Sequence, residues 1–207
     1  MTANRDANRR SFWLKQLHQW HWVSSALCLV GMLLFAATGI TLNHAGQIEA
    51  SPRVTTLNET LPADLTSLVQ PEGTASGPLP AAIRAWILDR MSVRIGEQAA
   101  EWSSDEVYVA LPRPGGDAWL TVDRGDGAII YELTDRGWIA WLNDLHKGRH
   151  AGLAWSLFID IFAVACVVFC LTGFVLLQFH AAKRPATWPM VGLGVVIPLL
   201  LIILLIH

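Results

Sequence analysis

Three long apolar stretches dominate the pattern of hydrophobic and polar positions along the chain. Residues 23–42 carry no charge over 20 positions. As a helix they would be about 30 Å long, enough to cross the hydrocarbon core of a bilayer. A second stretch covers residues 151–179 with a single acid, Asp160, and a third covers residues 188–206, where Pro198 is a candidate for a kink. The pattern therefore predicts three transmembrane helices.

The segment between the first two spans has the patterns of a small soluble domain. Residues 51–77 are rich in Pro, Thr and Ser and are expected to be mostly loop or short strand. Residues 80–91 space their apolar positions at three and four, with Pro80 in the first turn, which predicts a helix. Strands are then expected at residues 106–111, 118–122 and 128–133, the last two joined by a hairpin turn at Asp126-Gly127. The expected fold class is a mainly α membrane protein with a small α+β domain inserted between helices 1 and 2.

Composition supports this class and limits the chemistry of the inserted domain. Of the 207 residues 53% are hydrophobic and 15% are charged, which an ordinary soluble domain rarely combines. The domain contains no HExxH, GxSxG or phosphate-loop motif, so it is expected to bind or position something rather than to catalyse. Its arginines either attract an anionic ligand or form a solvated surface. They are Arg84, Arg90, Arg94, Arg113, Arg124 and Arg136.

Cations flanking the spans predict the orientation in the membrane. Four of them, Arg5, Arg9, Arg10 and Lys15, precede the first span, and Lys183 and Arg184 fill the link between the second and the third. Lys147 and Arg149 oppose this assignment weakly. The expected segments are a cytoplasmic N-terminus at 1–21, helix 1 at 22–43, a periplasmic domain at 44–146, helix 2 at 147–180, a cytoplasmic loop at 181–187 and helix 3 at 188–207, which ends in the periplasm. Cys28, Cys166 and Cys170 all fall within spans, and no disulfide framework is indicated.

The first two spans are similar in sequence at both ends. A Phe-x-x-Thr-Gly segment near the end of each, residues 35–39 and 169–173, is followed by a histidine, His44 or His180. A Leu-His pair with another histidine about one turn later precedes each span, giving His18 and His21 in the first copy and His146 and His150 in the second. Two such helices crossing a membrane in opposite directions would place imidazoles in facing pairs at both membrane surfaces.

Paired imidazoles from membrane helices are typical axial ligands of a b-type haem. No C-x-x-C-H motif is present, so such a haem would be bound non-covalently. His18 and His44 are 26 residues apart, about 39 Å along a helix, and His150 and His180 are 30 residues apart, about 45 Å; helix tilt can absorb that difference. The lengths favour His44 with His150 at the outer surface and His18 with His180 at the inner one. His21 and His146 remain open as ligands, as supporting donors or as propionate contacts.

Other residues in the spans have two interpretations each. Gly31, Gly39 and Gly173 allow either a porphyrin or another helix to approach closely. For Thr38 and Thr172 the simple interpretation is that they only bond back to their own helices. Asp160 is either an interfacial residue or, if buried in the membrane, a functional group such as a proton carrier.

These motifs resemble the PepSY-associated transmembrane helix proteins of bacterial inner membranes. The resemblance rests on Leu-His-x-Trp before the first span, on the two Thr-Gly pairs, and on Asp-Leu-His-Lys-Gly-Arg-His at residues 144–150. It covers both main spans and, more loosely, the domain between them, which looks like a PepSY module. The larger members have four or more spans, against three expected in this chain.

That family includes haem-containing reductases of ferric siderophores, which implies a corresponding function. The resemblance implies a protein of the inner membrane that uses two b-type haems, or one, to pass electrons to a ferric chelate or siderophore in the periplasm. The predicted cytoplasmic segments are too small for a flavin or NAD(P) domain, so quinol or another protein is the expected donor. The competing hypothesis is a haem-free, membrane-anchored PepSY protein that binds a peptide or regulates a protease. No nucleic-acid partner is expected, and a homo-oligomer is left open.

Overall fold

The computed structural model describes residues 2–48, 51–70 and 77–206. Residues 49–50 and 71–76 of the predicted outer domain lie outside the described residues. So do Met1, the first residue of the predicted cytoplasmic N-terminus, and His207, the last residue of predicted helix 3. The chain forms two compact units. We call residues up to 34 together with those from 158 onward the helical unit, and residues 35–157 the sheet unit.

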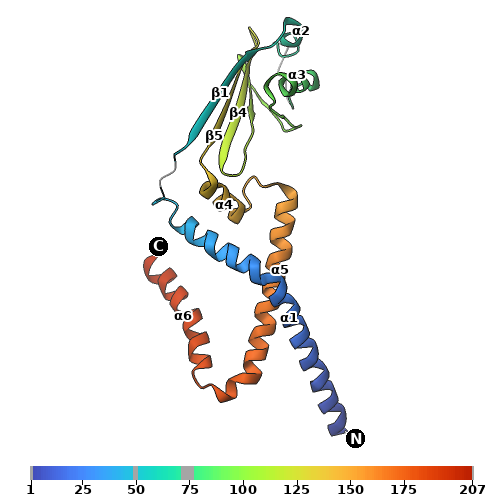
Figure 1. The fold of residues 1–207 in the computed structure, drawn as a ribbon, viewed down its shortest axis with the longest axis vertical. Coiled ribbons are helices and arrows are strands. Elements are labelled where there is room, and N and C mark those ends of the chain that lie inside the picture. Colours follow the sequence, from blue (N-terminus) through green and yellow to red (C-terminus); the bar gives the residue numbers. More distant parts are fainter. Residues whose placement is uncertain (1, 49–50, 71–76, 207) are drawn as a thin grey trace. The chain divides into compact units, whose positions relative to one another are not determined.

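Three helices of the described chain are long and apolar enough to cross a membrane. They are α1 (Thr2–Asn43), α5 (Gly152–His180) and α6 (Thr187–Leu205) (Figure 1). Most of their large apolar side chains are exposed in the isolated chain, as expected for surfaces that face lipid. Pro198 lies inside α6, which continues as one helix to Leu205. The three predicted spans are thus confirmed, and the chain is a multi-pass membrane protein.

Small residues line the contact between α1 and α5 within the helical unit. Ser24 and Cys28 of α1 are buried, and the thiol of Cys166 on α5 is close enough to hydrogen-bond with that of Cys28. Gly31 lies under the ring of Phe162, which a Cβ atom at this position would overlap. Close helix packing through small residues therefore accounts for Gly31.

The sheet unit contains five antiparallel strands in the order β1-β5-β4-β3-β2. Their bounds are β1 Arg53–Thr60, β2 Glu101–Trp102, β3 Glu106–Ala110, β4 Gly116–Asp123 and β5 Ala128–Asp135. In β4, Ala118, Leu120 and Val122 are buried and alternate with more exposed neighbours, as expected for a sheet with one covered face. In chain order these strands fall between α1 and α5.

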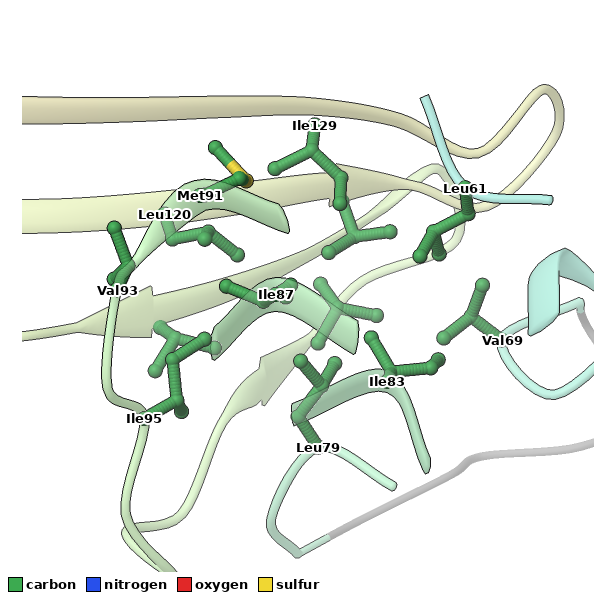
Figure 2. Packing of buried hydrophobic residues seen from close by; sticks show 13 residues of the cluster. Leu61, Val69, Leu79, Ile83, Ile87, Met91, Val93, Ile95, Leu120 and Ile129 are labelled. Atoms are coloured by element: carbon green, nitrogen blue, oxygen red, sulfur yellow. The ribbon is translucent and has the colours of Figure 1, made fainter. Parts of the chain in front are cut away.

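Helix α3 (Ala81–Met91) covers the buried face of this sheet. Ile83, Ile87 and Met91 lie on one side of α3 and pack with Leu120 and Ile129 of the strands (Figure 2). Full burial of each isoleucine side chain stabilises the fold by about 1.5–3 kcal/mol. The short helix α2 (Ala63–Thr66) lies in the connection between β1 and α3.

The predicted helix and the three predicted strands of this unit are present. Pro80 lies one position earlier than expected, at the N-cap of α3. The eight-residue strand β1 occupies a segment predicted to be mostly loop or short strand, and β2 was not predicted.

Helix α4 (Trp138–Lys147) was also not predicted, and because of it the helix of the second span begins later than expected. It ends at Gly148, whose φ of 67° is the left-handed conformation that commonly terminates helices. His150, with a φ of 56°, lies in the following turn, and α5 begins only at Gly152. The expectation that His150 and His180 share one continuous helix is therefore wrong, and the 45 Å argument does not apply to His150. A 3-10 turn, η1 (Ala181–Lys183), follows α5.

Candidate functional site

The second Phe-x-x-Thr-Gly segment, residues 169–173 of α5, contacts a histidine of α1 within the helical unit. The Nδ1 atom of His21 lies 3.0 Å from the Oγ1 atom of Thr172. The imidazole stacks on the ring of Phe169, with the centroids 4.9 Å apart and the planes at 14°. A Cβ atom at Gly173 would lie 3.1 Å from Cε1 of His21, so the glycine leaves room for the imidazole.

The first Phe-x-x-Thr-Gly segment, residues 35–39 of α1, makes the corresponding contact within the sheet unit. Here the histidine is His146 of α4, whose Nδ1 atom lies 2.7 Å from Oγ1 of Thr38. Its ring lies 5.0 Å from that of Phe35, at an angle of 45°. A Cβ atom at Gly39 would lie at an ordinary contact distance of 3.6 Å from the imidazole. Each copy of the repeat thus holds a histidine that precedes the other copy.

The two threonine hydroxyls also bond to backbone carbonyls of their own helices, and these bonds favour one tautomer of each histidine. The hydroxyl of Thr172 donates to the carbonyl oxygen of Val168, and that of Thr38 donates to the carbonyl oxygen of Phe35. Since a hydroxyl has one hydrogen, each threonine oxygen then accepts from the imidazole. The neutral imidazoles of His21 and His146 are consequently protonated at Nδ1, which leaves the lone pair of Nε2 available. The expected bonds of Thr38 and Thr172 to their own helices are confirmed, and the bonds to histidine are additional.

His18 and His180, the predicted inner ligand pair, are close together in the helical unit. Their ring centroids are 6.3 Å apart and their planes are at 83°. The Nδ1 atom of His18 donates to the carbonyl oxygen of Leu14 at 2.8 Å, and that of His180 donates to the carbonyl oxygen of Leu176 at 2.7 Å. Because a carbonyl can only accept, the Nε2 atoms of both rings keep their lone pairs. Both residues are exposed.

The spacing of these two rings suits a metal ion held between them. Nitrogens about 2 Å from a metal ion on opposite sides would put the ring centroids about 6 Å apart. In the described part of the chain no group of three or more His, Cys, Asp or Glu side chains could hold a metal. The two imidazoles are therefore the donors that this position offers to a metal or a metal-containing cofactor.

The surface next to His18 and His180 is apolar with a basic edge. One groove there is lined by side chains of α1 and α5 that are mostly apolar, together with Arg9 and Arg10. A second groove along α1 contains Arg10, Lys15 and His18. A flat apolar macrocycle with carboxylate substituents matches both features, since its ring would cover apolar side chains and its carboxylates would face arginine and lysine.

The structure does not bring the predicted outer pair together in the same way. His44 donates from Nδ1 to the carbonyl oxygen of Ile40 at 3.0 Å and is exposed, so its Nε2 atom is also available. His150 is exposed in the turn between α4 and α5. Among the described residues no ring contact joins His44 to His150. The outer site thus has suitable donors, and its ligand pair is not formed in this structure.

Two further groups in this region were not predicted as a functional arrangement. Thr41 of α1 donates to Oδ1 of Asn143 on α4 at 2.9 Å, one turn from the contact between Thr38 and His146. The carboxylate of Asp144 accepts from the backbone N–H of Gly115 and so ties α4 to the turn before β4. The Thr-Gly repeat was visible in the sequence, but one of its two histidine partners, His146, lies on the helix α4, which was not predicted. Asp160 is exposed and forms no ion pair within the described chain.

Comparison with known proteins gives one match that spans nearly all of the chain. The family described as Putative PepSY_TM-like matches residues 12–207. No curated protein and no solved structure matches the chain.

Proposed function

Because this chain belongs to the PepSY_TM-like family, we propose that it is a haem b-containing inner-membrane protein that passes electrons to ferric complexes in the periplasm, such as ferric siderophores. The observation that carries the proposal is the pair formed by His18 and His180. Their rings lie 6.3 Å apart, and both have Nδ1 bound to a backbone carbonyl and Nε2 available.

We assign the histidines to two bis-His sites. His18 and His180 would hold iron at the cytoplasmic side, and His44 and His150 would hold it at the periplasmic side. Haem, when bound, supplies one-electron redox chemistry between ferric and ferrous iron. The carbonyl oxygens of Leu14, Leu176 and Ile40 hold three of these imidazoles in the tautomer that can bind a metal.

His21 and His146 have supporting roles in this proposal. Each is held by a threonine, an aromatic ring and a glycine of the other repeat. These contacts lie one helical turn or less from His18 and His150 in the sequence, so they restrain the backbone that presents the ligands. Their Nε2 atoms are available to contact a cofactor group.

The orientation follows from the positive charges that flank the helices. With Arg9, Arg10 and Arg184 in the cytoplasm, the N-terminus is cytoplasmic and the end of α6 is periplasmic. The domain of residues 44–146 would then be a PepSY-like module in the periplasm. Lipid is the first partner of α1, α5 and α6, since each exposes large apolar side chains.

Reduction of ferric iron requires an electron donor, and a donor of two electrons reduces two ferric ions. Oxidation of one quinol to quinone releases two electrons and two protons, and two ferric ions each accept one electron. A reduced protein that gives up one electron at a time is the other donor class. Ferrous iron then leaves its chelator more easily, because hard oxygen ligands prefer the higher charge.

A visible spectrum of the purified protein tests this function. A Soret band with α and β bands that sharpen on reduction supports the proposal. A colourless protein after expression with adequate haem supply contradicts it and favours the haem-free binding or regulatory protein. Oxidation of the reduced protein by a ferric siderophore, followed at the α band, then tests the reductase activity.

A further inference from the structure

A cavity of about 610 Å³ lies in the sheet unit where the end of α1, the start of β1, the end of β5 and the start of α4 meet. It is lined on one side by Ala45 and Ile48, which follow α1, and on the other by Trp138, Ile139 and Asn143 of α4. Its size is in the range of small-molecule sites in proteins. The cavity is separate from the histidine contacts described above, although Ala45 directly follows His44 in the sequence.

Two arginines line this cavity without an acidic partner. Arg53 at the start of β1 and Arg136 after β5 are exposed, and neither forms an ion pair with a residue of the described chain. Asp135 is the register partner of Arg53 and also lines the cavity, but its Oδ1 atom accepts from the backbone N–H of Gly137. The two guanidinium groups outnumber the single carboxylate, so the cavity carries a net positive charge.

A buried amide also lines the cavity. Asn143 is only 8% exposed. Its side chain is hydrogen-bonded to the hydroxyl of Thr41, 2.9 Å away.

The first turn of α4 also favours an anionic ligand in this cavity. Gly137 at the N-cap has no side chain to bond the first N–H groups of this ten-residue helix, and three of the lining residues, Trp138, Ile139 and Ala140, belong to that turn. Free N–H groups and the positive end of the helix dipole favour a negative charge. Ile48, Trp138 and Ile139 add apolar walls, so the arrangement suits an anion with a partly apolar body.

We propose that this cavity binds a carboxylate-bearing small molecule through Arg53 and Arg136. If the proposed function holds, on which this identification rests, the natural ligand is a polycarboxylate chelate of ferric iron, which would dock in the same unit as His44 and His146. The bond between Asn143 and Thr41 connects the cavity to α1 one turn from Thr38.

Calorimetric titration of the purified full-length protein with gallium(III) citrate tests the proposal. Gallium has the charge of ferric iron and is not reduced under these conditions, so binding is measured without electron transfer. Replacement of either arginine, Arg53→Gln or Arg136→Gln, is expected to weaken binding about tenfold, since each removes a charge-assisted hydrogen bond. Arg94→Gln is the matched control, because Arg94 is an exposed arginine of the same unit outside the cavity.

The outcomes separate this inference from the proposed function. Gallium citrate that binds the wild type and the Arg94 variant alike, and both cavity variants more weakly, supports the site whether or not the protein contains haem. Absent binding, or equal binding by all four proteins, overturns the site even if haem is present. The titration is repeated in nanodiscs of phosphatidylcholine with and without phosphatidylglycerol. Binding that disappears with phosphatidylglycerol assigns the cavity to lipid headgroups and also overturns the proposal.

Discussion

The Nδ1 atom of His146 lies 2.7 Å from the Oγ1 atom of Thr38, and this bond joins α4 to the end of α1. The same pair of residue types recurs in the helical unit as His21 and Thr172. The hydrogen bond therefore belongs to the repeated sequence and occurs in both units of the protein.

Replacing Thr38 by valine should destabilise the protein. Valine has nearly the shape of threonine but no oxygen, so the Nδ1–H of His146 would lose its acceptor in a half-buried position. The expected cost is about 1–3 kcal/mol in the free energy of unfolding, measured by chemical denaturation of the solubilised protein. Thr38→Ser is the control and should unfold close to the wild type. Equal stability of the valine variant and the wild type would show that the bond contributes nothing.

The two glycines of the repeat should differ in their tolerance of alanine. At Gly173 the new Cβ atom would lie 3.1 Å from His21, which is tight, whereas at Gly39 it would lie 3.6 Å from His146, an ordinary contact. Gly173→Ala should therefore displace its histidine and lower the unfolding temperature, and Gly39→Ala should change it little, since alanine favours the helix. The opposite order would contradict the packing described for the two histidines.

The spans and much of the sheet unit could be predicted because their sequence patterns are local. Twenty uncharged apolar residues determine a span, and alternating residues such as those of β4 determine a strand. The strand β1 could have been found too, because Val54, Thr55 and Thr56 favour extended structure. The composition rich in Pro, Thr and Ser left loop and short strand as alternatives for this segment.

The arrangement of the histidines could not be predicted in the same detail. The end of α4 had a signal, since Lys147 in the last turn is followed by Gly148. Which histidine faces Thr38 depends on how α4 packs against α1, and one sequence does not contain that information. The rings of His18 and His180 are close together on α1 and α5. The length comparison that paired them also assumed one helix from His150 to His180, which is not present.

Alanine substitutions in α3 should lower the free energy of unfolding more at a buried position than at an exposed one. Ile87 is 0% exposed and packs against the sheet, whereas its neighbour Leu88 is 44% exposed. Ile87→Ala should lower the free energy of unfolding by about 2–5 kcal/mol. Leu88→Ala, the matched control, should cost about 0.5 kcal/mol or less, as is usual at the surface. Similar losses at both positions would mean that α3 does not cover the sheet in this way.

Asp123 should make the stability of the sheet unit depend on pH. Backbone N–H groups of Asp126 and Gly125 bond its carboxylate, and they hold the pKa of Asp123 below its usual value. The charged form is thus favoured by folding. Its contribution is present above the usual aspartate pKa of about 3.9 and is lost as the pH falls through the lower pKa of the folded state.

The variant Asp123→Ala measures that contribution. It should be less stable than the wild type at pH 7, and the difference should shrink as the pH falls below about 3.9. Thermal unfolding followed by tryptophan fluorescence across this range provides the comparison. Asp117→Ala is the control, since Asp117 is an exposed aspartate of the same strand. A difference that stays constant down to pH 2 would exclude a role for the Asp123 charge.

The ratio of haem to protein tests the central claim most directly. The purified wild type should contain about two haems per chain, each held by two imidazoles. His180→Ala and His44→Ala should each reduce the ratio to about one, because they remove ligands of different haems, and the double variant should contain almost none. A wild type without haem, or a ratio that neither substitution changes, would contradict the assignment of these histidines as haem ligands.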